Sequence, residues 1–86
     1  MITEQDLIKA AQEWRDSKSF QSSMLWDNTP YVEVSETISA RAIVKHGVWH
    51  FQAKWRDSLF ITKERLLFAI QEIEQHEIEF WENLDY

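Results

Sequence analysis

The sequence ISARAIVKHGVWHFQAKWR, residues 38–56, carries the strongest structural pattern in the chain. Apolar and polar side chains alternate on both sides of His46-Gly47, which is typical of two antiparallel strands joined by a two-residue turn. We therefore expect a β-hairpin with strands at 38–45 and 48–56.

The register of this hairpin follows from the same alternation. If Lys45 lies opposite Val48, one face of both strands is entirely apolar, and a shift by one residue would bury cations instead. Small alanines then face large aromatic rings, which leaves room for helices on this face. The predicted apolar pairs are Ile38 with Trp55, Ala40 with Ala53, Ala42 with Phe51, and Val44 with Trp49.

The segment before the hairpin predicts a helix and a loop. Helical spacing of apolar residues covers about 4–17, with Thr3 as N-cap and Asp6 as its capping-box partner. Periodicity stops at about 18–30, where Trp26 either covers an edge of the core or forms an exposed anchor. Residues 31–34 form an earlier strand or extend the first arm of the hairpin, giving a strand at about 31–45.

The segment after the hairpin predicts a second helix. A short third strand at 59–61 is one option, and Thr62 can cap a helix over about 63–82. On this helix, Phe68 points away from the apolar stripe and is either covered by the loop or a surface anchor.

The expected fold is a single domain over residues 1–86, of the two-layer α+β class in the order α-β-β-(β)-α. A small antiparallel sheet of two or three strands carries the N- and C-terminal helices on its aromatic face. The double-stranded-RNA-binding domain has the same order. Its glycine-rich second turn and lysine-rich last helix are missing from DSLFITKERLL (57–67), so the similarity is one of topology alone.

Composition sets the broad class. The 86 residues are 44% hydrophobic and 14% aromatic, which suffices for one core. The chain has no cysteine, which excludes disulfides and thiolate zinc sites. No signal-peptide pattern and no run of about 18 apolar residues occurs, so we expect a cytoplasmic protein without membrane contact.

The net charge of -6 is confined to the end of the chain. Residues 1–71 contain nine acidic and nine basic residues and are neutral. Residues 72–86 contain no Lys or Arg, and apolar residues alternate with six carboxylates there: Glu72, Glu74, Glu77, Glu79, Glu82 and Asp85. The chain is therefore electrostatically lopsided.

This acidic, aromatic segment is the first candidate site. Aromatic anchors within a charged rim favour protein–protein contact, and the carboxylates would select a basic partner, in one version by standing in for the phosphates of a nucleic acid. The alternative is that the helix overshoots the sheet and the acids only keep the chain soluble. The predicted contact residues are Glu74, Glu77, Glu79, Phe80, Trp81 and Glu82.

The outer face of the hairpin is the second candidate. Arg41, Lys45, Lys54 and Arg56 form a basic stripe that would bind nucleic acid. The aromatic residues that would stack on bases are predicted on the opposite face, so we expect this face to be solvated. It could also meet the acidic helix of a second copy and give a homo-oligomer.

Catalytic and metal-binding patterns are absent from the sequence. His46, His50 and His76 lack the spacing of metal ligands, and the lone Gly47 excludes glycine-rich phosphate loops. His76 is expected to pair with Glu72 one helical turn away. We therefore expect no enzyme activity, cofactor or metal, and predict a small adaptor or inhibitor, typical of a phage or bacterial accessory factor.

Overall fold

The computed structural model describes residues 2–17 and 29–83. Its strands form one antiparallel sheet in the order β1-β2-β3-β4, so each strand neighbours the next one in sequence. This confirms the α+β class, with four strands where the sequence predicts two or three. The elements are α1 (Glu4–Asp16), β1 (Val32–Glu33), β2 (Ile38–Lys45), β3 (Val48–Trp55), β4 (Leu59–Lys63) and α2 (Leu66–Glu82).

The central hairpin, β2 and β3, has the predicted register at every pair from Ile38–Trp55 to Lys45–Val48. Its turn residues His46 and Gly47 both have positive φ, at 53° and 76°. This is the conformation of a type I′ turn, whose twist matches that of the flanking strands. The alternation of side chains and the turn geometry thus specify the same pairing.

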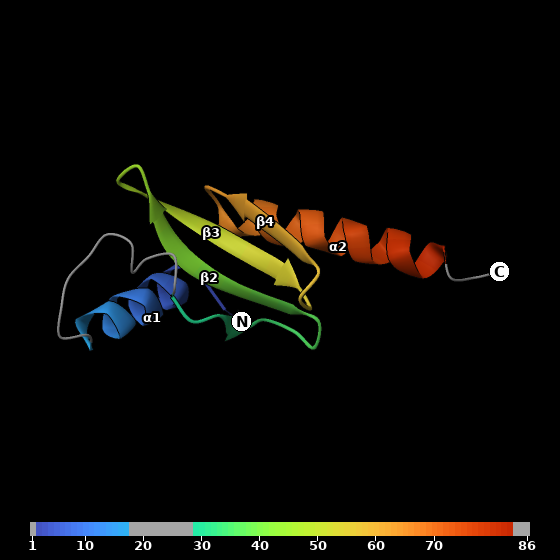
Figure 1. Cartoon of the computed structure of the whole chain (residues 1–86). Coiled ribbons are helices and arrows are strands. Elements are labelled where there is room, and N and C mark those ends of the chain that lie inside the picture. The colour runs from blue at the N-terminus through green and yellow to red at the C-terminus, as the bar shows by residue number, and fades with distance from the viewer. Residues whose placement is uncertain (1, 18–28, 84–86) are drawn as a thin grey trace.

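Both helices lie on one face of the sheet, with α1 against β2 and α2 against β3 and β4 (Figure 1). The core between the two layers contains Leu7 from α1, Ile73 from α2 and Phe51 from β3, all buried. Because an alanine side chain ends at Cβ, it lets helix and sheet backbones approach closely. Five alanines are fully buried at this contact: Ala11, Ala40, Ala42, Ala53 and Ala69.

Helix α1 begins as the sequence predicts. The Thr3 hydroxyl accepts the Asp6 backbone N–H at 3.2 Å, and the Asp6 carboxylate accepts the Thr3 backbone N–H at 2.9 Å. The Thr3 backbone N–H and hydroxyl hold the pKa of Asp6 below its usual value. This capping box places the buried Leu7 and Ala11 on the face that meets the sheet.

The alternative of an earlier strand within residues 31–34 is confirmed by β1, and a single strand over 31–45 is wrong, because the chain reverses between β1 and β2. The Ser35 hydroxyl accepts the backbone N–H groups of Thr37 and Ile38 at 3.4 and 3.2 Å. The Val34 N–H donates to the Ile38 carbonyl at 2.8 Å. These bonds close a turn, and β1 folds back onto β2 as a short edge strand.

The predicted helix start at residue 63 is also wrong. Strand β4 continues to Lys63, and Thr62 lies within it, where its hydroxyl accepts the Gln52 side-chain amide at 3.1 Å. Helix α2 therefore begins at Leu66, and the Arg65 side chain makes no capping hydrogen bond. The Thr62 hydroxyl therefore forms a hydrogen bond within the sheet and does not cap α2.

Two isoleucines of α2 provide a stability test. Ile73 is 0% exposed and Ile78 is 52% exposed, so they sample the buried and the exposed parts of one helix. We expect Ile73→Ala to lower the free energy of unfolding by about 2–5 kcal/mol. Ile78→Ala should change it by less than about 0.5 kcal/mol. Urea unfolding of both variants measures the difference, and equal losses would contradict the packing described above.

Candidate functional site

The start of α2 is held by a carboxylate from α1. Glu4 accepts the Leu66 backbone N–H at 2.9 Å and the Arg65 side-chain Nε–H at 2.9 Å, across 62 residues of sequence. Partial burial of Glu4 acts to raise its pKa, but the Leu66 hydrogen bond and the Arg65 guanidinium together lower it. Glu4 thus supplies the cap that α2 lacks in its own sequence.

Helix α2 is longer than the stretch of sheet beneath it. Strand β4 ends at Lys63, opposite Phe51, and β3 ends at Trp55. This stretch of β3 is roughly 13 Å long, whereas the 17 residues of α2 span about 25 Å. The last turns of α2 consequently project past the strand ends, as Figure 1 shows.

A chain of aromatic rings leads from the core to this projecting end. The Trp55 ring lies 5.0 Å from the Phe80 ring, and Phe80 lies 5.4 Å from Trp81 in an edge-on arrangement. Trp55 is buried, Phe80 is half-buried and Trp81 is 50% exposed. Phe80 therefore supports Trp81 instead of acting as a free anchor beside it.

The predicted acidic residues divide into two groups. Glu77 is half-buried and accepts the Thr37 hydroxyl at 3.3 Å, which ties α2 to the turn before β2. Glu74, Glu79 and Glu82 are exposed, and Glu79 accepts the Gln75 side-chain amide at 3.3 Å. The structure places Trp81, Glu79 and Glu82 in the last turns of α2, leaves Glu74 in the middle of the helix, and gives Glu77 a structural contact.

These carboxylates have no counter-ion within the described part of the chain. In residues 2–17 and 29–83, no Lys, Arg or His nitrogen lies within 4.0 Å of the four predicted glutamates. The last turn of α2 contains no basic residue, although its dipole would favour one. The ion pairs that Lys and Arg make among the described residues use other acids: Lys63 with Glu72 at 2.8 Å, Arg65 with Glu4 at 2.9 Å and Lys54 with Asp57 at 3.1 Å.

The structure adds residues that the sequence argument left out of the site. Ile78 is exposed next to the acidic residues, and its position about 120° around the helix from Leu66 signals this. Phe68 is exposed on another side of α2, which settles its position as a surface residue. Trp26, predicted as a cover or an anchor, lies outside the described residues.

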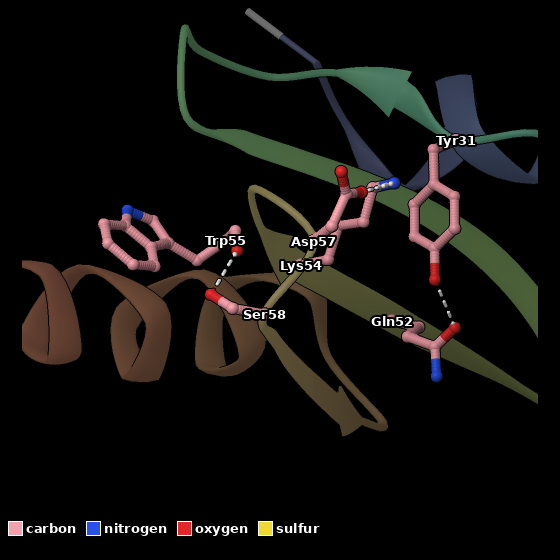
Figure 2. A network of polar contacts seen from close by, with 6 residues as sticks. All are labelled: Tyr31, Gln52, Lys54, Trp55, Asp57 and Ser58. Carbon is pink, nitrogen blue, oxygen red and sulfur yellow. Dashed lines mark hydrogen bonds and ion pairs between the residues drawn. The ribbon is translucent and has the colours of Figure 1, made fainter.

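The basic stripe on the outer face is largely engaged in internal contacts. The Tyr31 hydroxyl donates to Gln52 Oε1 at 2.8 Å, and the Arg41 Nε–H donates to the same oxygen at 2.9 Å. Arg41 and Lys54 lie 4.6 and 4.3 Å from the centre of the Tyr31 ring. Figure 2 shows Lys54 pairing with Asp57 beside Tyr31 and Gln52.

The remaining two cations of the stripe lie apart from this network. Lys45 is exposed beside the β2–β3 turn. Arg56 follows the end of β3 with φ 53°, and its guanidinium lies 4.9 Å from the Trp55 ring, which belongs to the helix-covered face. In the same turn, the Ser58 hydroxyl donates to the Trp55 carbonyl at 3.4 Å (Figure 2). The four cations therefore do not form one open patch.

The histidines show no metal-binding arrangement. In the described residues, no group of three or more His, Asp or Glu side chains is placed to hold a metal ion. The predicted pair of His76 with Glu72 is wrong, because Glu72 binds Lys63 and the His76 ring packs edge-on against Trp55 at 5.4 Å. Across the described ranges, neither helix has the length and apolar character needed to cross a membrane.

Comparison with protein-family models, curated proteins and solved structures finds no match. The function therefore has to be argued from the chemistry of the α2 surface and the outer face.

The Glu4 cap gives a pH-dependent prediction. Because folding lowers the pKa of Glu4 from its ordinary value of 4.5, its stabilisation is complete above that pH and is lost as the pH falls through the folded-state pKa. Glu4→Gln should cost about 1 kcal/mol at neutral pH and much less at about pH 3. Denaturant unfolding at both pH values measures this.

Glu13→Gln is the matched control, since Glu13 is exposed on the same helix and its side chain makes no hydrogen bond or ion pair with the other described residues. It should be neutral at both pH values. A Glu4→Gln cost that stays the same at both pH values would contradict a charged cap.

Proposed function

We propose that this chain is a small, non-enzymatic protein-interaction module, an adaptor or inhibitor, that docks on a basic partner through the C-terminal half of α2. The observation that carries the proposal is Trp81. Its indole is half-exposed and supported by Phe80, and it lies in the last turns of α2 together with Glu79 and Glu82, which are exposed and have no counter-ion among the described residues.

Trp81 has the properties of an interface anchor. Tryptophan is enriched among the residues that dominate binding energy at protein interfaces. The contact from Trp81 through Phe80 to the buried Trp55 restricts the side chain before a partner arrives. Less conformational entropy is then lost on binding, which increases affinity for a given contact area.

The acids supply selectivity. Glu74, Glu79 and Glu82 belong to residues 72–86, which carry the whole net charge of -6, whereas residues 1–71 are neutral. The negative field of this segment speeds encounter with a positive surface and repels a negative one. A nucleic-acid-handling protein presents such a positive surface, so we take this class as the proposed partner, with carboxylates occupying the places of phosphates.

The proposed setting is the cytoplasm, where a cysteine-free chain needs no oxidising compartment to fold. A small accessory factor of a phage or bacterium fits this size and this mode of action.

One observation favours a second function, the binding of single-stranded nucleic acid on the outer face. Phe60 is exposed and lies directly across the strands from Lys54, with Tyr31 beside Lys54. Aromatic rings next to cations can stack on bases and contact phosphates. The internal pairing of Arg41 and Lys54 makes this the weaker of the two proposals.

Two variants, Trp81→Ala and Phe68→Ala, test the first proposal. Trp81→Ala should weaken binding of the captured partner at least tenfold, because it removes the anchor. It should cost less than about 1.5 kcal/mol of stability, the value of the lost ring contact. Phe68→Ala, at a similarly exposed site on another side of α2, should leave binding unchanged. Affinity capture from native lysate followed by calorimetric titration measures both.

Charge reversal separates the two functions. Glu79→Lys should abolish capture of the basic partner and leave any RNA binding intact, whereas Lys54→Glu should do the opposite. Partner affinity should also fall as salt rises. Unfolding of the Trp81→Ala variant would place Trp81 in the core and remove the proposal's anchor.

A further inference from the structure

A groove of about 600 Å³ lies between the start of α1 and the first two turns of α2. Such a volume is within the usual range for a binding pocket. Its exposed lining is more apolar than polar, with Ile2, Val34, Leu67 and Ile70 beside the polar residues Gln5, Arg65 and Glu74. The groove therefore offers apolar surface to a large side chain.

The α2 wall of this groove continues along the helix as one stripe. Successive members are three, four, four and three residues apart, a spacing that places them on one side of a helix. The intervals are the same when read from either end of the stripe, and Glu74 is its central residue. The stripe consists of Leu67, Ile70, Glu74, Ile78 and Trp81.

The two ends of the stripe are complementary. At one end, Leu67 is 59% exposed at the open groove, and at the other end Trp81 projects past the sheet. In an antiparallel pair of α2 helices, Trp81 of each copy lies opposite Leu67 of the other, and Ile78 lies opposite Ile70. We infer that α2 pairs with α2 of a second copy, with each Trp81 entering the other copy's groove.

Charge supports a second copy as the occupant. Arg65 lines the groove and uses its Nε–H for Glu4, so its other N–H groups leave a positive charge at the end of the groove that receives the acidic end of a second copy's α2. The two Glu74 side chains meet on the symmetry axis, where their repulsion limits affinity and fixes the register, as a polar residue does within a coiled coil. A seam of about 21 Å with this central repulsion favours a weak dimer.

This pairing does not rest on the proposed function, but the two are linked. The dimer covers Trp81, so a basic partner that docks on Trp81 binds the monomer. Self-association then reduces the fraction of the chain that is free to bind at high concentration.

Disulfide trapping tests the geometry, because the chain has no cysteine of its own. Paired helices 8–10 Å apart bring the central Cα atoms to about 5 Å, within disulfide range. Glu74→Cys should form a covalent dimer under mild oxidation at least tenfold faster than Gln75→Cys, which is exposed on another side of α2. Equal rates for the two variants would overturn the pairing.

Sedimentation velocity tests the affinity of the dimer. The wild type should dimerise as concentration rises through the micromolar range, and Leu67→Glu should remain monomeric. Phe68→Glu should dimerise as the wild type does, because Phe68 is equally exposed outside the stripe. Glu74→Leu should tighten the dimer at least tenfold by replacing the repulsion with apolar contact. A monomeric wild type, or a Glu74→Leu variant that is no tighter, overturns the inference.

The Glu74→Leu variant also distinguishes dimerisation from the proposed function. Glu74→Leu removes a charge that a basic partner would use, so it weakens or leaves unchanged that interaction while it tightens the dimer. A failure of dimerisation leaves partner capture by Trp81 intact, and a failure of partner capture leaves the dimer intact.

Discussion

The burial of Ala69 and Ile73 against β3 and β4 determines the position of every other part of α2. Once these two residues fix the helix on the sheet, its remaining length extends past the strand ends. Trp81, Glu79 and Glu82 at that end are therefore exposed as a consequence of packing. Glu4 at the start and Glu77 near the end make the only two recorded polar ties between α2 and the elements before β2, within the described residues.

The two halves of α2 have different roles. The first half of α2 stabilises the fold and forms one wall of the groove, and the second half carries Ile78 and Trp81. Helix surfaces that serve stability rarely carry uncompensated acids near the C-terminus, where the dipole opposes them.

The sequence predicts the sheet and the helices well, because their signals are local. Strand alternation and the His46-Gly47 turn determine the hairpin register, and Thr3 with Asp6 marks the start of α1. The sequence does not predict the start of α2, because its cap, Glu4, lies on a distant part of the chain. No pattern within residues 60–70 contains that information.

The candidate site is predictable in part. Helical spacing places Trp81 and the acids near one another, but it does not tell which glutamate meets Thr37 or that Glu72 prefers Lys63 to His76. The engagement of Arg41 and Lys54 with Tyr31 is likewise a tertiary contact. The groove joins Ile2, Val34 and Leu67 from three separate segments, so it becomes visible only in the folded chain.

The central claim is that α2 is anchored by its first half and projects at its end. Amide hydrogen exchange in dilute protein tests this most directly, because protection reports the free energy of local opening. The amides of residues 70–77 should exchange only through nearly global unfolding, and those of residues 80–83 at least about a hundredfold faster. Uniform protection through Asn83 would contradict the claim, since it would require the last turns to be packed as firmly as Ile73.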